Sequence, residues 1–166
     1  MKGITLIGMP AAGKATVGRE LAERLSWPIY DIDDIMEAKE GVTPAEITKQ
    51  KGRDYTIRLE SQSVAELDLH DSVLATPGSI IYATDCHQQL RDQTHIVWLN
   101  VSLGALEERL AYDPNNTRGI IGLEDGGLEK LFKERKPLYQ SLGQITIDPG
   151  SKDPETIATE IMAQTT

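Results

Sequence analysis

The sequence has little cysteine, few histidines and a shortage of basic residues. Cys86 is the only cysteine among 166 residues, so an internal disulfide and a cysteine-based zinc cluster are excluded. The three histidines show no spacing typical of metal ligands. Lysine and arginine number 17 against 26 acidic residues, and the net charge of −9 disfavours nucleic acids and acidic membranes as partners.

Long apolar runs are absent as well. The stretch from Met1 to Met9 is too short for a membrane span and leads directly into a glycine-containing loop, so we expect neither a signal peptide nor a membrane anchor. With no disulfide possible, we expect the protein in a reducing cytoplasm. These absences leave open a small anionic ligand, bound where basic side chains converge locally.

The residues that are present predict one α/β domain over residues 1–166. Hydrophobic residues make up 39% and charged residues 26%, which is ordinary for a soluble domain with a buried core. Apolar runs alternate with helical periodicity, which predicts a three-layer α/β/α arrangement around a five-stranded parallel sheet. We expect strands at 2–7, 27–31, 72–76, 95–99 and 144–147, and helices at 15–25, 33–39, 54–69, 85–91, 102–110, 128–142 and 153–164, with another helix beginning at Thr43–Pro44.

The loop from Gly8 to Ala15 reads G-x-x-x-x-G-K-A and follows the first predicted strand directly. A glycine-rich turn between a strand and a helix directs backbone N–H groups at phosphate oxygens, and the helix N-terminus adds partial positive charge. Lys14 supplies a full positive charge to the outer phosphates of a nucleotide. Ala15 stands where a serine or threonine hydroxyl normally binds Mg²⁺.

Polar residues follow the second and third predicted strands. Asp31 and Asp33 end one strand, and 76–79 ends the next. Ligands of an open parallel sheet bind beyond the carboxyl ends of its strands, so these residues and the loop predict one site. One carboxylate would help to hold hydrated Mg²⁺ and the other would accept a proton from a substrate hydroxyl. The alternative is that Asp33 or Asp34 only caps the following helix.

Together these motifs resemble the shikimate kinase family, small phosphate-loop kinases that transfer the γ-phosphate of ATP to a hydroxyl of shikimate in aromatic amino-acid biosynthesis. The resemblance covers nearly the whole chain. It rests on G-M-P-A-A-G-K-A-T-V-G at 8–18, Y-D-I-D at 30–33, V-L-A-T-P-G-S at 73–79, T-R-G at 117–119 and E-R-K-P-L-Y at 134–139. It implies a phosphate-loop nucleotide-kinase-like fold, a mobile lid at about 112–127, ATP and Mg²⁺ as cofactors, a small-molecule substrate and a monomer.

On the nucleotide side, the resemblance assigns Lys14 to the transferring phosphate and places Asp31 near the metal, which it would bind through water. Arg118 would lie in the lid and close over the phosphates, where an arriving arginine adds positive charge and excludes water. The nucleotide-binding residues that the resemblance implies are Gly8, Pro10, Ala11, Ala12, Gly13, Lys14, Ala15, Thr16, Arg118 and Pro154.

On the acceptor side, the resemblance makes Asp33 the residue that binds substrate hydroxyls and acts as the base. Gly78 would offer its backbone N–H to the substrate. Arg135 would pair with the substrate carboxylate, because its planar fork can bind both oxygens. These assignments make Lys14, Asp33 and Arg118 the candidate catalytic residues.

The chain departs from the family pattern at several of these positions. Ala15 lacks the metal-binding hydroxyl, and the neighbouring Thr16 lies about 100° around the helix. The family arginine of F-R-x-x-E falls on Ile57, and Arg58 lies one residue late, so either Arg58 substitutes through a local shift or one arm of the carboxylate clamp is lost. Losing one charge-assisted contact would cost about 1.5–3 kcal/mol.

Two further departures concern a turn and the adenine side. The family's glycine triplet reads Pro77–Gly78–Ser79, in which Pro77 removes a backbone donor. The adenine-side arginine falls ambiguously between Arg109 and Ala111. Besides shikimate phosphorylation, these changes leave two alternatives: a kinase of a different small hydroxylated metabolite, and a catalytically impaired nucleotide-binding paralogue with a regulatory role.

Overall fold

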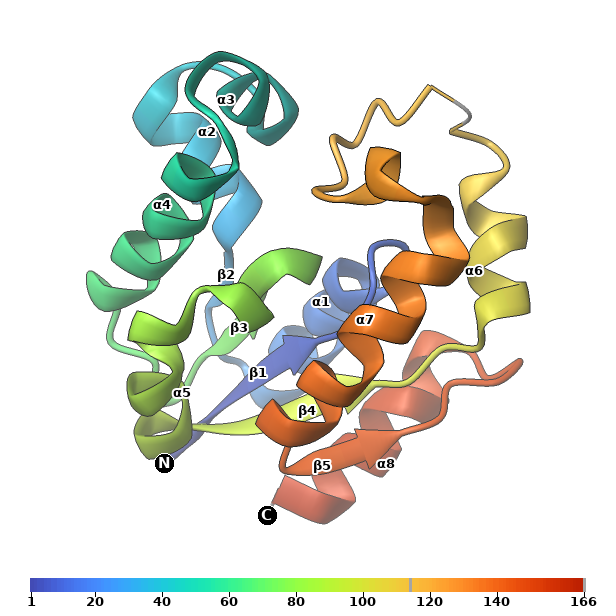
Figure 1. The fold of residues 1–166 in the computed structure, drawn as a ribbon. Coiled ribbons are helices and arrows are strands. Elements are labelled where there is room, and N and C mark those ends of the chain that lie inside the picture. Colours follow the sequence, from blue (N-terminus) through green and yellow to red (C-terminus); the bar gives the residue numbers. More distant parts are fainter. Residues whose placement is uncertain (114, 166) are drawn as a thin grey trace.

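A parallel sheet forms the centre of the molecule (Figure 1). A computed structural model describes residues 1–113 and 115–165, and over these ranges the sheet has five strands in the order β2-β3-β1-β4-β5. Ile4 of β1 is in register with Val73 of β3 on one side and His95 of β4 on the other. The strands are β1 Gly3–Ile7, β2 Ile29–Asp31, β3 Val73–Ala75, β4 Thr94–Leu99 and β5 Ile145–Ile147. All five predicted strands are confirmed.

Helices cover both faces of the sheet, which confirms the three-layer α/β/α prediction. In Figure 1, α1 and α8 lie together behind the sheet, and α5 and α7 lie in front of it. The helices are α1 Lys14–Leu25, α2 Ile32–Glu40, α3 Pro44–Lys51, α4 Arg53–Ala65, α5 His87–Gln93, α6 Leu103–Leu110, α7 Gly127–Leu142 and α8 Pro154–Thr165, with 3₁₀ turns η1 Gly78–Tyr82, η2 Thr84–Cys86 and η3 Leu123–Asp125. Pro114, within the predicted lid, lies outside the described residues.

Side-chain caps begin two helices as the sequence predicts. The Thr43 hydroxyl accepts a hydrogen bond from the Glu46 N–H at 3.3 Å, and Ser102 does the same at the start of α6. The end of α4 differs from its prediction, because the helix stops at Ala65 instead of 69. There Gln93 accepts the Leu69 N–H at 3.1 Å and Asp68 accepts the His70 N–H at 3.1 Å, so side chains take up backbone groups that a continued helix would need.

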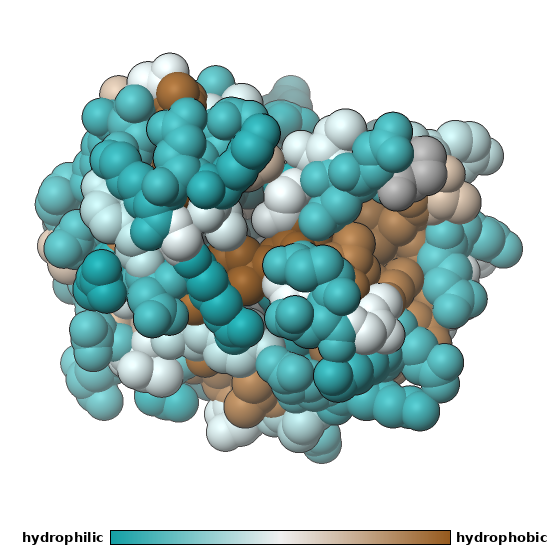
Figure 2. Space-filling model, turned by 45° about the horizontal axis from the view of Figure 1, so that its top comes forward, coloured by the Kyte–Doolittle hydropathy of each residue, from teal (hydrophilic) through white to brown (hydrophobic). Residues whose placement is uncertain are grey.

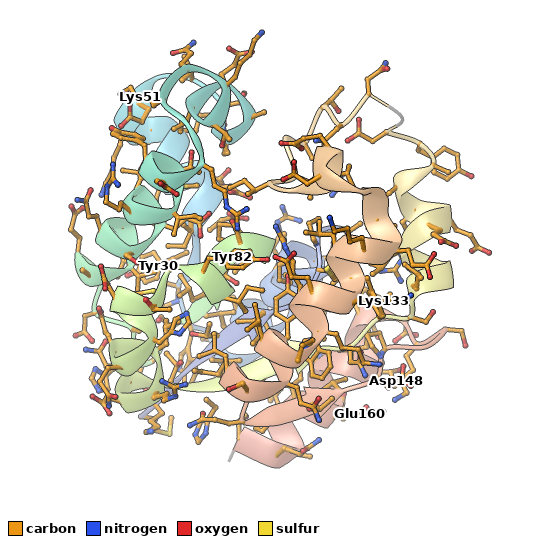
Figure 3. All side chains as sticks on the ribbon, in the orientation of Figure 1. Tyr30, Lys51, Tyr82, Lys133, Asp148 and Glu160 are labelled. Atoms are coloured by element: carbon orange, nitrogen blue, oxygen red, sulfur yellow. The ribbon has the colours of Figure 1, made fainter. Side chains whose placement is uncertain are left out.

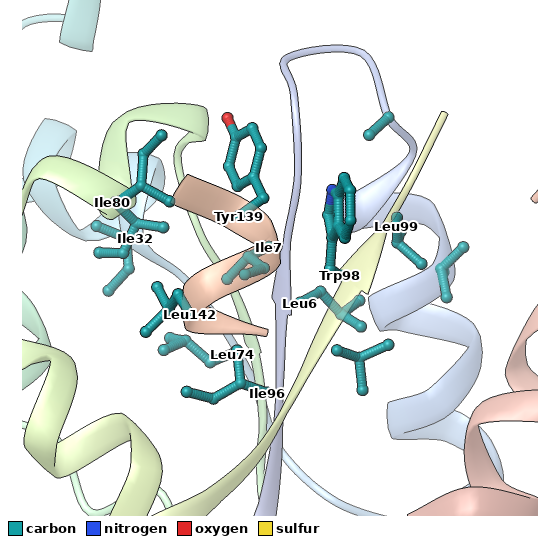
Figure 4. Close-up of a cluster of buried hydrophobic side chains, with 14 of the residues drawn as sticks. Leu6, Ile7, Ile32, Leu74, Ile80, Ile96, Trp98, Leu99, Tyr139 and Leu142 are labelled. Carbon is teal, nitrogen blue, oxygen red and sulfur yellow. The ribbon is translucent and has the colours of Figure 1, made fainter. Parts of the chain in front are cut away.

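The core lies between the sheet and α7 on one face, and between the sheet and α1 on the other (Figure 4). Trp98 of β4 and Tyr139 of α7 stack with ring centroids 6.3 Å apart. The Tyr139 hydroxyl donates to the Gly78 carbonyl at 2.6 Å. The packing of α7 on the sheet therefore also positions η1, which follows β3. None of the described helices is long and apolar enough to span a bilayer.

Candidate active site

An open cleft of about 620 Å³ lies beyond the carboxyl ends of β1, β2 and β3. Figure 2 shows hydrophobic residues at the floor of a hollow between the α2–α4 region and the rest of the molecule, with hydrophilic residues around it. The cleft is lined from the loop after β1, the starts of α2 and α3, one face of α4, the turn after β3, residues 117–121, and Arg109 and Arg135. The residues that follow the first three strands therefore share one cleft, as the sequence predicts.

The loop after β1 has the backbone shape needed to surround an anion. Gly8 and Gly13 have φ values of 151° and 93°, and a Cβ at Gly8 would lie 2.8 Å from the Leu99 carbonyl oxygen. Lys14 is 9% exposed, and its Nζ donates to the carbonyls of Gly8 and Met9, each at 2.8 Å. Burial lowers the pKa of Lys14 to about 8, although Asp33 opposes this change.

The first turn of α2 holds the two acidic residues. Asp31 caps the helix, because its Oδ1 accepts the Asp33 N–H at 2.9 Å. The alternative that Asp33 or Asp34 is the cap is therefore wrong. Asp31 and Asp33 both line the cleft. Although part of the Asp33 side chain is open to the cleft, desolvation by surrounding protein atoms raises its pKa to about 6, with Asp31 adding to this and Lys14 opposing it.

These residues fit a hydrated Mg²⁺ brought in with nucleotide phosphates. Among the described residues there is no group of three or more histidine, cysteine or acidic side chains that would hold a metal alone. Mg²⁺ in kinase sites uses one or two carboxylates with phosphates and several waters. Burial raises the pKa of Asp31 as well, and a cation near both carboxylates would offset that cost. Ala15 and Thr16 also line the cleft.

Arg135 of α7 lines the cleft beside Gly78 and is 1% exposed. Its Nη2 donates to the Ile121 carbonyl at 2.7 Å, while its Nε and Nη1 have no partner among the described residues. A Cβ on Gly78 would lie 2.9 Å from Arg135 Nη1 and 2.7 Å from Pro10 Cδ. Close approach of the loop and the arginine therefore requires glycine at 78. Two buried N–H groups of a guanidinium are available for a carboxylate.

Residues 117–121 cross from α6 toward α3. Asp113 accepts the backbone N–H groups of Thr117 at 2.8 Å and Arg118 at 3.2 Å, and so shapes the turn that carries Arg118. Gly119 lies against α3, because a Cβ there would be 2.5 Å from the Ala45 Cβ. Arg118 and Gly119 both line the cleft. The segment predicted as a lid thus reaches across to the opposite wall.

Comparison with known proteins decides the family. The family model described as shikimate kinase matches residues 10–166. The chain belongs to the shikimate kinase family. It is 34% identical to a shikimate kinase of Sulfurihydrogenibium sp. over 99% of this chain and 98% of that relative, and 37% identical to one of Dechloromonas aromatica over 89% and 81%.

Solved structures of shikimate kinases have the same fold. The enzyme from Acinetobacter baumannii, solved in complex with shikimate, gives a TM-score of 0.88 at 29% identity and covers 99% of this chain and 92% of its own. The enzyme from Aquifex aeolicus gives a TM-score of 0.79 at 26% identity over 97% and 94%. These agree with the predicted phosphate-loop kinase fold.

Some residues predicted from the shikimate kinase pattern do not line the cleft. Arg58 is exposed and lines a second hollow with Ile57, Arg53 and Tyr82. The local shift by which Arg58 would replace the missing family arginine is therefore absent, and the other alternative, the loss of one arm of the carboxylate clamp, remains. Pro154 starts α8 and also lies outside the cleft lining. Gly8 and Ala12 belong to the loop but are buried and do not line the cleft, and the Ala12 N–H donates to the Met9 carbonyl at 3.0 Å.

Among the other lining residues to which the resemblance gave no role are three that make side-chain hydrogen bonds: Arg109, Glu60 and Ser79. Arg109 donates from Nη1 to the Ala11 carbonyl at 2.7 Å, so of Arg109 and Ala111 it is Arg109 that lies at the phosphate loop. Glu60 and Ser79 are 1% and 6% exposed, and the Ser79 hydroxyl donates to Glu60 Oε1. Glu60 had a sequence signal, since it stands at the glutamate position of the family's F-R-x-x-E motif. Ser79 had its place in the 76–79 stretch at the end of the third predicted strand as its only sequence signal.

Proposed function

We propose that this protein is an ATP-dependent phosphotransferase that moves the γ-phosphate of ATP to a hydroxyl of shikimate. The observation that carries the proposal is the one cleft in which Lys14, Asp33 and Arg135 lie together. Membership of the shikimate kinase family and likeness to a homologue solved with shikimate support this acceptor. A phosphate-binding end, a carboxylate and a carboxylate-binding guanidinium are the three elements that the reaction needs.

The nucleotide side would work by positioning and charge. Backbone N–H groups of the loop after β1 surround the phosphates, and Lys14 exchanges its two carbonyl partners for phosphate oxygens. Arg118 adds positive charge from the lid, and Arg109 lies beside the same loop. Phosphoryl transfer depends mainly on such placement, because little covalent chemistry falls to the protein.

The acceptor side would orient one hydroxyl. The free Nε and Nη1 of Arg135 bind the acceptor carboxylate, which places the ring between Arg135 and Asp33. Asp33 is ionised at neutral pH and takes the hydroxyl proton. The hydroxyl oxygen then forms its bond to the γ-phosphorus, the bond from that phosphorus to the bridging oxygen breaks, and ADP leaves.

Bound Mg²⁺ supplies neutralisation of phosphate charge. Asp31 would hold it through a water molecule, with Asp33 beside it. Position 15 offers no hydroxyl, so phosphates and waters would fill the remaining coordination positions. The chain therefore offers one metal ligand fewer than it would with serine or threonine at position 15.

We also propose that residues 1–166 act as one domain and that the lid at 112–127 closes over the phosphates through Arg118. We infer a monomer that works in the cytoplasm on a small molecule, with neither nucleic acid nor membrane as partner. The net charge of −9 supports the exclusion of nucleic acid and acidic membranes.

A coupled ADP-release assay with shikimate and Mg²⁺ tests the function. We expect ADP release that requires both shikimate and Mg²⁺. In Lys14→Met the rate of ADP release should fall at least about 100-fold. Lys133→Met on the outer face of α7 (Figure 3) is the matched control and should retain wild-type turnover. ADP release that stays at the background without acceptor would overturn the proposal.

Two other outcomes would identify a different function. Turnover with another hydroxylated acid but not with shikimate would indicate a related kinase, which Ile57 and Pro77 favour. Tight ATP binding without transfer to any acceptor would indicate a nucleotide-binding paralogue, which Ala15 favours.

A further inference from the structure

Glu60 presents an incompletely satisfied carboxyl group to the cleft. It lies on the face of α4 that lines the cleft, and it is 1% exposed. Its Oε1 accepts the Ser79 hydroxyl, while its Oε2 is buried and has no partner among the described residues. A buried carboxyl oxygen without a partner is costly, and a ligand in the cleft is the group that can supply one.

Among the described residues, no second cation on this side of the cleft compensates the Glu60 carboxyl. Of the basic residues in the described lining, Lys14, Arg109 and Arg118 lie at the nucleotide end, so Arg135 is the acceptor-side cation. Arg53 and Arg58 from α4 line the second hollow instead. An ionised Glu60 would therefore share one guanidinium with the acceptor carboxylate, and the two anions would repel each other.

The titratable and charged groups that face Glu60 come from three elements besides η1, which carries Ser79. Asp33 of α2 adds negative charge, Arg135 and Tyr139 approach from α7, and Cys86 lies in η2. Burial raises the pKa of Glu60 to about 8, and the Ser79 hydrogen bond and Arg135 oppose that rise. Lys14, which neighbours Asp33, also has a pKa of about 8, so a test must separate the two groups.

We propose that Glu60 is a specificity-determining residue that binds the acceptor as an uncharged carboxylic acid, donating a hydrogen bond from Oε2 to an acceptor oxygen. Ser79 is the positioning residue, because its hydroxyl occupies Oε1 and leaves the proton on Oε2. This rests on the proposed function and narrows its substrate class to a monocarboxylate that is held by one guanidinium and one neutral acid. The site offers no second cation for the other carboxylate of a dicarboxylate.

The test is calorimetric binding of shikimate to the nucleotide-free protein between pH 6.5 and 9.5. If only the protonated form binds, the dissociation constant stays level below about pH 7.5 and rises about tenfold for each pH unit well above 8. In Glu60→Gln, whose amide still donates, we expect near wild-type affinity at pH 7 and loss of that rise. In Ser79→Ala the rise should move to higher pH, because the carboxylate loses a stabilising donor.

Glu23→Gln on the exposed face of α1 is the control and should follow the wild type at every pH. The inference is overturned if the dissociation constant of Glu60→Gln rises with pH as in the wild type, because Lys14 would then be the titrating group. It is overturned as well if the dissociation constant of the wild type does not rise. It is also overturned if folded Glu60→Gln loses binding at pH 7, since an anion would then be needed. Failure of the proposed acceptor is distinguishable, because the wild type would bind no shikimate at any pH.

Discussion

Ala11 adopts a φ of 66° in the middle of the phosphate loop, in the left-handed region that favours glycine. For a residue with a Cβ this costs about 1–2 kcal/mol. Its carbonyl accepts the hydrogen bond from Arg109 of α6, which stabilises the strained turn. A strained backbone conformation that surrounding contacts stabilise is typical of ligand sites. The loop therefore keeps its anion-binding shape although an alanine occupies this position.

Ala15 is the residue whose replacement should improve metal use. Ala15→Ser adds one oxygen where the chain offers none, and we expect the Mg²⁺ concentration for half-maximal rate to fall about fivefold, equivalent to about 1 kcal/mol. The measurement is initial rate against Mg²⁺ at saturating ATP and shikimate. Ala65→Ser, at the end of α4, controls for the added hydroxyl. An unchanged Mg²⁺ requirement would show that position 15 does not face the metal.

Asp33 should oppose folding while it enables the reaction. Its pKa is raised from 3.8 to about 6, so the native state binds the proton more tightly, and stability is lost as pH rises through this window. At pH 7.5 we expect Asp33→Asn to raise Tm by about 2–4 °C, a value already reduced for solvent screening, and to lower kcat at least about 100-fold.

The gain in Tm should disappear near pH 4.5, where Asp33 is protonated in the folded protein. For the wild type, kcat/KM should fall as pH drops below about 6. Asp34→Asn, the neighbouring acid outside the cleft lining, is the control in calorimetry and in the assay. An equal gain in Tm from both variants would refute a specific cost at Asp33.

At the scale of elements, the lid and α3 meet through small residues. Gly119 approaches Ala45 so closely that no side chain fits between them, and its φ of 64° also favours glycine. Two residues further along, the Ile121 carbonyl accepts a hydrogen bond from Arg135. The lid thus contacts α3 at one point and the acceptor-binding arginine at another.

Gly119→Ala should hold the lid away from α3. We expect kcat to fall about tenfold, because Arg118 no longer reaches the phosphates, and Tm to fall by about 2–8 °C, because alanine at a φ of 64° costs about 1–2 kcal/mol. Gly104→Ala in α6, where a Cβ meets open space, is the control and should leave activity unchanged. Wild-type kcat in Gly119→Ala would mean that this contact is not needed for closure.

At the scale of the whole molecule, the cleft separates the sheet from the α2–α4 region and the lid (Figures 1 and 2). The sheet supplies the loop after β1 and the turn after β3. The acidic residues at the start of α2 and Glu60 of α4 come from the opposite wall. Ligands that contact both walls stabilise the folded state, because the unfolded chain does not bind them.

A non-hydrolysable ATP analogue with Mg²⁺ should therefore raise Tm. At 100 times the dissociation constant the stabilisation is about 2.7 kcal/mol, which corresponds to about 5–10 °C for a chain of this size. Calorimetric scans of wild type and Lys14→Met make the comparison, and the variant should lose most of the shift. An equal shift in Lys14→Met would place the nucleotide elsewhere on the protein.

Local chemistry determined most of the fold and part of the site. Several features depend only on residues that are close together in the chain, so the sequence alone predicts them. They are the apolar pattern of each strand, the glycines of the loop after β1, and the helix caps Thr43 and Ser102. Asp31, Asp33 and Lys14 could be placed in one site because they stand at the ends of parallel strands, whose carboxyl edges coincide.

Only the tertiary structure decided which side chains complete the cleft. The rotation of α4 against η1 brings Glu60 to Ser79 and leaves Arg58 in the second hollow, although both are on the same helix. Arg109 reaches Ala11 from 98 residues away. Such contacts depend on how elements pack, and burial then shifts the pKa of Glu60 by an amount that no local pattern contains.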